Sequence, residues 1–415
     1  MSTPETPDTP APPRAPDAPD ADAPPAPATG QMARRIAQLG SLRVAFVLAL
    51  IWIVFQSQND NFLSSFNLTN LVLQISAVGI ISIGVVLVLL LGEIDLSVGA
   101  VSGLAAAVMA VLNVKHGWGP IPAIGAGLAT GAAIGAINGF FVTTFTIPSF
   151  VVTLAGLLAW QGALLLVLGD TGTVNLNDET ITGLAGTFYG DAVGWALVVV
   201  VIGSYAASGY LERLRRGRAG LALPSLTSFL VRLALVAAGT IAAVLVLLSD
   251  RGVPLAGLIL VGMCGIGAFI TTRTSFGRHL YATGGNAEAT RRSGVSVTRI
   301  RMIVYVSCST LAAAGGIMAA SRLLAVNQGS GGSDLLLLAI AGPVIAGTSL
   351  FGGRGSIWDA LLGALVIGSI ANGMDLLALA SSVKFMITGG VLLLAVVIDA
   401  VIKNQRERAG AARAP

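Results

Sequence analysis

The chain has 415 residues, of which 54% are hydrophobic and only 11% charged, and its formal net charge is +4. Soluble domains usually carry about a quarter charged residues, so a soluble fold of this length could not cover its surface with polar groups. The composition therefore excludes an ordinary soluble protein and predicts an all-α polytopic membrane protein, because lipid must be the solvent for much of the chain.

The N-terminal segment differs from everything that follows it. Residues 1–32 are rich in Pro, Ala and Asp and hold almost no large apolar side chain. Such a segment cannot bury enough surface to offset the entropy of ordering it, so we expect a disordered tail. It lacks the charged start and apolar core of a secretory signal. We divide the remainder into a transmembrane domain over 33–402 and a basic tail over 403–415.

Apolar runs long enough to cross a bilayer recur through the transmembrane domain. The expected spans lie near 41–56, 70–91, 97–114, 121–142, 150–168, 192–210, 229–248, 253–271, 302–321, 335–350, 357–379 and 383–402. The runs at 97–114 and 335–350 are short or interrupted by glycine, so we expect about ten to twelve transmembrane helices.

An even number of spans with both ends in the cytoplasm places nearly all Lys and Arg residues on the cytoplasmic side of the membrane. Of the 24 Lys and Arg residues, only four then fall outside the cell: Lys115, Arg251, Arg322 and Lys384. The largest inside loop, 272–301, is basic, whereas the largest outside loop, about 169–191, contains no Lys or Arg. The charge count therefore predicts a multi-pass protein of the plasma membrane with cytoplasmic N- and C-termini.

A faint pattern occurs twice along the chain. An Asp-Leu pair at Asp95 precedes an Asn-Gly pair at Asn138, and an Asp-Leu pair at Asp334 precedes an Asn-Gly pair at Asn372. Under the expected topology the first two lie at the inner side and the last two at the outer side. This is the arrangement of an inverted transporter repeat, with the substrate path between the halves. The alternative is chance recurrence in a chain with 52 glycines.

Missing motifs exclude several classes of enzyme. No lysine follows a glycine, so the chain has no phosphate-binding loop with which to hydrolyse ATP. The two histidines, His116 and His279, are expected on opposite faces of the membrane, which excludes a zinc protease and a His-based triad. We expect no catalytic residue, no metal and no cofactor. No ionisable group lies at the centre of a span, which disfavours an ion-coupled transporter.

The inside loop 272–301 carries the most informative local pattern. Local rules predict a short helix over 287–293 with an N-cap, an acidic first turn, a basic last turn and a left-handed end. The residues that supply these features are Asn286, Glu288, Arg291, Arg292 and Gly294. Two helical turns are marginal alone in water, so we expect this helix to dock on a partner. The alternative is a basic loop that anchors beside lipid headgroups.

This loop resembles the cytoplasmic coupling loop of ABC importer permeases of the ribose/xylose type, where a Gly-Asn-x-x-Ala-x-x-x-Ser-Gly pattern is typical. The matching positions are Gly285, Asn286, Ala289, Ser293 and Gly294. A second match is the run Gly-Glu-Ile-Asp-Leu-Ser-Val-Gly over 92–99, in which Glu93 replaces the family's usual second glycine, as in the xylose-like branch. A third match is the glycine-rich run over 347–356.

The resemblance covers roughly residues 70–402 and implies a set of partners. These are a second permease subunit, as in a homodimer, two cytosolic ATPase subunits and an extracytoplasmic sugar-binding protein, with membrane lipid around them and no nucleic acid. It also implies that the loop helix, with Glu288, Arg291 and Arg292, transmits the movement of the ATPase subunits.

Polar residues at the span boundaries are expected to act as gates or helix caps. They are Glu93, Asp95, Ser97, Asn138, Asp334 and Asn372. Asp95 and Ser97 can cap the helix that begins near residue 97. The alternative for Asp95 is direct contact with a sugar.

The expected function is therefore that of the permease subunit of an ATP-driven importer for a monosaccharide, such as xylose or a related pentose. Three alternatives stay open. The first is an ion-coupled sugar symporter, and the second is an intramembrane enzyme, which the missing nucleophile–base pairs disfavour. The third is an ABC permease for another solute, such as nucleosides or branched-chain amino acids.

Overall fold

Helices dominate the structure, a computed structural model that describes residues 40–221, 223, 225–391, 393–394 and 397. The helices are α2 (Gly40–Gln58), α3 (Ser65–Leu90), α4 (Val98–Ala110), the π-helical turn η1 (Val111–Lys115), α5 (Pro120–Thr144), α6 (Ser149–Leu168), α7 (Glu179–Gly186), α8 (Asp191–Arg218), α9 (Leu226–Leu248), α10 (Leu255–Arg273), α11 (Ser275–Gly285), α12 (Ala287–Arg292), α13 (Val297–Leu323), α14 (Ser333–Ala346) and α15 (Trp358–Leu376). Residues 381–391 are also helical. The strands are β1 (Thr173–Asn175), β2 (Phe188–Tyr189), β3 (Val253–Pro254) and β4 (Ala325–Asn327).

Eleven of the twelve expected spans coincide with an apolar helix, and the described start of the twelfth, 383–391, is helical. Within the described residues, nine helices are long and apolar enough to cross a membrane, namely α3, α4 with η1, α5, α6, α8, α9, α10, α13 and α15, while α2 and α14 are shorter apolar helices. The all-α polytopic fold that the sequence predicts is confirmed. Both expected tails, 1–32 and 403–415, and the end of the expected last span lie outside the described residues.

Helices α3 and α13 form the centre of the packing, and α8 and α9 lie at its edge. In α3, 89% of the most apolar window is buried inside the protein, against 11% in α8 and in α9. A helix that is apolar on all sides must be covered by protein or by lipid. We infer that α3 is covered by protein, whereas α8 and α9 turn most of their surface to lipid.

Each of the two central helices packs against helices from the other half of the sequence. Helix α13 packs along α4 and α5, α3 packs along α14 and α15, and α3 and α13 pack on each other. Glycines permit the close approach: a Cβ added at Gly135 of α5 would lie 2.5 Å from the carbonyl oxygen of Tyr305 in α13. In α15, a Cβ added at Gly363 would lie 2.1 Å from the carbonyl oxygen of Gly342 in α14. The inverted repeat itself stays a prediction.

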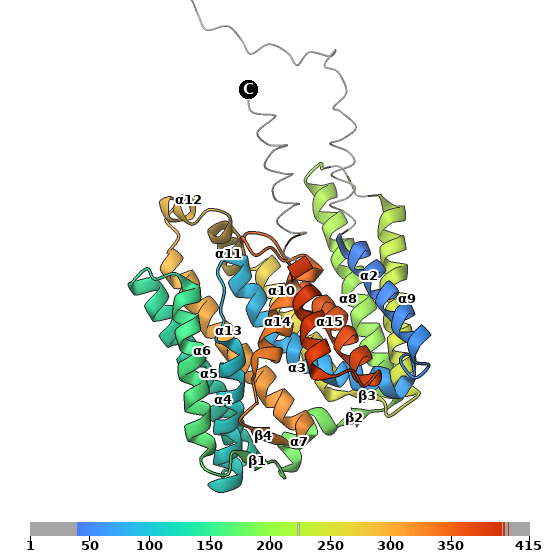
Figure 1. Cartoon of the computed structure of the whole chain (residues 1–415). Coiled ribbons are helices and arrows are strands. Elements are labelled where there is room, and N and C mark those ends of the chain that lie inside the picture. Colours follow the sequence, from blue (N-terminus) through green and yellow to red (C-terminus); the bar gives the residue numbers. More distant parts are fainter. Residues whose placement is uncertain (1–39, 222, 224, 392, 395–396, 398–415) are drawn as a thin grey trace, which may run out of the picture. The chain divides into compact units, whose positions relative to one another are not determined.

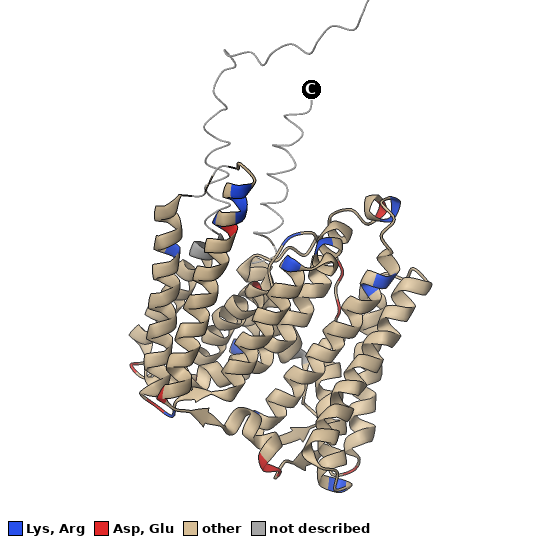
Figure 2. Cartoon of the chain, turned by 180° about the vertical axis from the view of Figure 1, so that it is seen from behind, with Lys and Arg blue, Asp and Glu red and all other residues tan. Residues whose placement is uncertain are grey.

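The loops between the helices fall at two ends (Figure 1). One end, here called the basic end, carries α11, α12 and the loop 347–357. The other, the strand end, carries the antiparallel pairs β1–β4 and β2–β3. Figure 2 shows that most of the Lys and Arg residues gather at the basic end, as the charge count on the sequence predicts.

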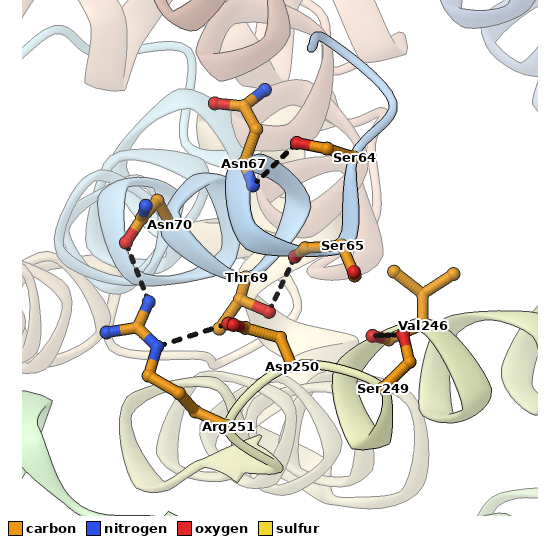
Figure 3. Close-up of polar contacts among 9 residues, drawn as sticks. All are labelled: Ser64, Ser65, Asn67, Thr69, Asn70, Val246, Ser249, Asp250 and Arg251. Carbon is orange, nitrogen blue, oxygen red and sulfur yellow. Dashed lines mark hydrogen bonds and ion pairs between the residues drawn. The ribbon is translucent and has the colours of Figure 1, made fainter.

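At the strand end, Arg251 ties the start of α3 to the turn between α9 and β3 (Figure 3). Its Nη2 donates a hydrogen bond to Asn70 Oδ1 at 2.9 Å, and its Nε donates to Asp250 Oδ2 at 3.1 Å. The guanidinium also lies over the rings of Phe66 and Phe188, with 5.4 and 4.6 Å to the centroids. Arg251 is therefore engaged as a clamp between elements of the protein itself.

Candidate functional site

The basic loop 272–301 folds into two short helices that project at the basic end. Helix α12 begins after Asn286, whose Oδ1 accepts a hydrogen bond from Ala289 N at 2.9 Å. It ends before Gly294, which has a φ of +85°. The expected short helix, its cap and its left-handed end are confirmed.

The residues that the sequence assigns to a coupling loop are all exposed. They are Gly285, Asn286, Glu288, Ala289, Arg291, Arg292, Ser293 and Gly294. Within α12 the one buried residue is Thr290. Glu288 forms ion pairs with Arg292 at 3.1 Å and with Arg291 at 3.3 Å. Exposed pairs of this kind contribute little stability, so the outer face of α12 is available to a partner.

Three turns meet without intervening side chains where α11 ends. A Cβ added at Gly284 would lie 1.7 Å from the carbonyl oxygen of Leu90 and 2.8 Å from Gly353 N. Gly353 N itself donates a hydrogen bond to the Leu90 carbonyl at 2.9 Å. A Cβ added at Gly352 would lie 2.8 Å from Gly92 N. We call Leu90, Gly92, Gly284, Gly352 and Gly353 the glycine junction; it brings the three sequence motifs together.

Tyr281 adds a side-chain contact beside the glycine junction. Its hydroxyl donates a hydrogen bond to the carbonyl oxygen of Gly355 at 2.9 Å. Burial raises the pKa of the Tyr281 phenol, and the negative charge of Asp359 raises it further. The phenol therefore stays protonated and remains a donor, which fixes α11 to the loop 347–357.

Glu93 connects the turn after α3 to the beginning of α13. Its Oε2 accepts a hydrogen bond from the Tyr305 hydroxyl at 2.7 Å. Its Oε1 lies 2.7 Å from Arg301 Nε, an ion pair in which that N–H is not aligned for a hydrogen bond. The Glu93 side chain is 11% exposed and that of Arg301 27%. Because α13 follows α12 along the chain, this pair links the basic loop to the turn over 91–97.

Asp95 lies inside that turn and is 3% exposed. Its Oδ1 accepts hydrogen bonds from Ser97 N at 2.8 Å and from Ser97 Oγ at 2.6 Å, whereas its Oδ2 has no partner in the described part of the chain. Ser97 gives the first turn of α4 no side-chain hydrogen bond, so the pair closes a turn ahead of the helix. Burial raises the pKa of the Asp95 carboxyl, and the hydrogen bonds from Ser97 oppose the rise.

Asn138 continues this network into α5. It is buried, and its Nδ2 donates a hydrogen bond to Ser97 Oγ at 3.0 Å. Helix α6 supports the same turn, because Leu96 N donates to Thr153 Oγ1 at 3.1 Å. The structure thus brings Glu93, Asp95, Ser97 and Asn138 together at the basic end, held by α5, α6 and α13.

Asn372 lies at the strand end, far from this network along the helices. It forms a reciprocal amide pair with Asn67: Asn67 Nδ2 donates to Asn372 Oδ1 at 2.7 Å, and Asn372 Nδ2 donates to Asn67 Oδ1 at 3.0 Å. Both asparagines are buried. Asp334 is exposed in the first turn of α14, where the helix dipole favours a carboxylate.

Sequence reasoning did not single out Arg301, Tyr305, Asn67 or Gly284. A signal existed for the first two, because a spacing of four residues places Arg301 and Tyr305 on the same face of a helix. Gly284 stands beside the matched Gly285, but its neighbour Leu90 is distant in the sequence. Among the residues that the structure describes, no group of three or more His, Cys, Asp or Glu is placed to hold a metal ion.

Comparison with known proteins places the chain among transport components. Residues 67–396 match a family described as the permease component of the branched-chain amino acid transport system. The chain is 36% identical over 363 residues to the xylose transport system permease protein of Escherichia coli, which covers 87% of this chain and 92% of that protein. It is 33% identical over 362 residues to the ribose import permease protein of Bacillus subtilis, covering 87% and 92%. No solved structure matches the chain.

Proposed function

Because this chain belongs to the ABC-transporter permeases of the ribose/xylose type, we propose that it is the transmembrane subunit of an ATP-driven importer of a monosaccharide, xylose or a related pentose. The relatives named for xylose and ribose transport are similar over most of their own length. The sugar assignment carries over to this chain the substrates for which these relatives are named. As a permease subunit it is a component of a transporter and not an enzyme.

The observation that carries the coupling part of the proposal is the glycine junction. Helix α11 touches the end of α3 and the loop 347–357 backbone to backbone, so it cannot shift without moving both. Helix α12 stands on α11 with its charged face uncovered. A partner that pulled on α12 would therefore move the turn over 91–97 and the loop 347–357 together. Such coupling requires contacts that differ between two states.

The partners follow from this assignment. ATP hydrolysis takes place in two cytosolic ATPase subunits, which contact α12 through Glu288, Arg291 and Arg292. A second copy of the chain completes the permease, and an extracytoplasmic binding protein delivers the sugar at the strand end. The basic end then faces the cytoplasm, as the distribution of Lys and Arg favours. The charge count on the sequence favours the same side for both termini.

The test of the coupling site uses the reconstituted complex of permease, ATPase and binding protein. Glu288→Arg reverses the charge that α12 offers, and Gly294→Pro abolishes the left-handed residue that ends it. We expect both variants to lose most sugar-stimulated ATPase activity and uptake while the permease still folds. Gly220→Pro is the matched control, because Gly220 is also left-handed, with nothing within 4 Å of an added Cβ. Normal coupling in the α12 variants would refute the assignment.

Two alternatives, a different solute and a different source of energy, have separate tests. The family description names branched-chain amino acids, so the cognate binding protein should be titrated with pentoses and with leucine or valine. Binding of the amino acid alone would keep the ABC mechanism and replace the sugar. Uptake that continues in vesicles without the ATPase subunits would instead favour an ion-coupled symporter.

A further inference from the structure

A glycine in α6 leaves two polar atoms of neighbouring side chains facing the same space. A Cβ added at Gly156 would lie 3.0 Å from Trp160 Nε1 and 3.5 Å from Asn138 Oδ1. Trp160 stands four residues after Gly156, and helical side chains slope toward the N-terminus, so the indole N–H extends over the turn that contains Gly156. A larger residue at 156 would press on both atoms.

The hydrogen bonds around Asn138 fix which way its amide points. Asp95 Oδ1 accepts from both the backbone N–H and the hydroxyl of Ser97, so the Ser97 hydroxyl proton is already used. Ser97 Oγ therefore accepts from Asn138 Nδ2 at 3.0 Å. The carboxamide oxygen is then turned toward Gly156, 3.5 Å from the position that a Cβ there would take.

The indole N–H of Trp160 is a hydrogen-bond donor beside this acceptor. Its Nε1 is buried and finds no acceptor within the described part of the chain. An indole N–H is a donor only, and buried donors without a partner are rare in native proteins. One donor and one acceptor thus lie within 3.5 Å of the position that a Cβ of residue 156 would take, and the donor has no partner among the described residues.

We propose that Trp160 Nε1 and Asn138 Oδ1 bind one hydroxyl group of the sugar as it passes through the permease. A hydroxyl both donates and accepts, so a single group satisfies both atoms. An ammonium group could donate to Asn138 but not accept from Trp160, and a carboxylate could accept from Trp160 but not donate to Asn138. The pair therefore selects a neutral polyol, an inference that rests on the proposed function.

The site is connected to the basic loop through residues already described. Gly156 lies seven residues into α6 from its basic end, which is about 10 Å at 1.5 Å per residue. Ser97 orients the Asn138 amide, and the turn that contains Ser97 is tied by Glu93 to Arg301 at the start of α13. Movement of that turn would turn the amide oxygen away and release the sugar.

The test compares two variants with matched controls in the reconstituted complex. Trp160→Phe removes the indole N–H and keeps an aromatic ring, and Gly156→Ala places a methyl group close to both polar atoms. Trp195→Phe changes an exposed tryptophan of α8, and Gly162→Ala changes a glycine of α6 with nothing within 4 Å. We expect both site variants to lower maximal uptake about three- to tenfold, with an unchanged KM for loaded binding protein. The controls should transport normally.

A second readout separates binding from a structural role. Among the monodeoxy forms of the sugar that the binding protein still accepts, one should be transported about three- to tenfold more slowly by the wild type. The Trp160→Phe variant should no longer distinguish that form from the parent sugar. Unchanged discrimination at every position would overturn the site while leaving sugar import intact. Failure of the wild-type complex to import any sugar would instead refute the proposed function.

Discussion

The two Asn-Gly pairs of the expected repeat lie at opposite ends of the protein and form different hydrogen bonds. At the basic end, Asn138 donates to Ser97 and Ser97 donates to Asp95, so the network ends on a carboxylate whose second oxygen has no partner among the described residues. At the strand end, Asn372 and Asn67 satisfy each other with two amide hydrogen bonds. The same sequence pattern therefore gives an open network in one half and a closed pair in the other.

The difference shows which end is built for change. A reciprocal amide pair has its needs met within the fold, so it holds α3 against α15 in one arrangement. The network at the basic end leaves Asp95 Oδ2 and Trp160 Nε1 without partners in the described residues, and it is tied through Glu93 to the helix that follows α12. Unsatisfied buried groups are costly, so their presence argues for a function that uses them.

The largest effect should come from filling the close helix contacts that support each pair. A Cβ at Gly135 would meet the backbone carbonyl of Tyr305 at 2.5 Å, whereas a Cβ at Gly368 would meet the Ile75 side chain at 2.2 Å. Side chains can move and helix backbones cannot easily do so. We expect Gly135→Ala to destabilise the permease by about 3 kcal/mol or more and Gly368→Ala by about 1 kcal/mol. Thermal unfolding in detergent measures both.

Gly125→Ala provides the control for that experiment. Gly125 lies in the same helix as Gly135, with nothing within 4 Å of an added Cβ. Alanine is a better helix former than glycine, so this variant should be as stable as the wild type or more so. Equal stability of the Gly135 and Gly368 variants would show that the two halves are packed alike.

Breaking the closed pair should have the next largest effect. Asn372→Leu leaves the buried Asn67 amide facing an apolar side chain, and we expect a loss of about 2 kcal/mol in the free energy of unfolding. Asn67→Leu combined with Asn372→Leu should recover part of that loss, because no orphan amide remains at the pair. A double variant less stable than either single variant would contradict the view that the Asn67 and Asn372 amides serve only to satisfy each other.

Local rules predicted the features that depend on neighbours in sequence. The cap at Asn286, the end of the helix at Gly294 and the apolar runs of the spans are each set by a few adjacent residues. The family resemblance, carried by short motifs, is confirmed by the matching family and relatives. Assignment of the coupling and gate residues stays a prediction, although the structure gathers Glu93, Asp95, Ser97 and Asn138 in one network.

The contacts that sequence reasoning could not supply join residues far apart in the chain. Nothing near Gly284 indicates that it lies against Leu90, because that contact depends on how α11 docks on α3. The partner of Asn138 is Ser97, and the partner of Asn372 is Asn67, yet both asparagines precede glycine in apolar runs. Tertiary packing alone decides that one amide meets a hydroxyl and the other meets an amide.

A smaller effect is expected where the open network joins the basic loop. Glu93→Gln removes the charge that pairs with Arg301 but retains an oxygen that can accept from Tyr305. Because both side chains of the ion pair are partly exposed, we expect a loss of about 1 kcal/mol in stability. The relative loss of sugar-stimulated ATPase activity should be larger than the relative loss of stability. Asn372→Asp, at the closed pair, should show the reverse order, with the larger change in the melting temperature.

The smallest effect on stability, and one of opposite sign, is expected from Asp95→Asn. Burial raises the pKa of Asp95 above its ordinary value of 3.8, so the folded protein favours the neutral carboxyl. A group with a raised pKa in the folded state supports stability below its unfolded pKa, and that support is lost as the pH rises through the folded pKa. Asparagine has no charge to bury, and its Oδ1 can still accept from Ser97. The variant should therefore match the wild type at low pH and exceed it increasingly as the pH rises from about 4 toward neutrality. Melting temperatures of both proteins across that range measure the difference, and a wild type that gains on the variant with rising pH would show that the folded protein stabilises the carboxylate.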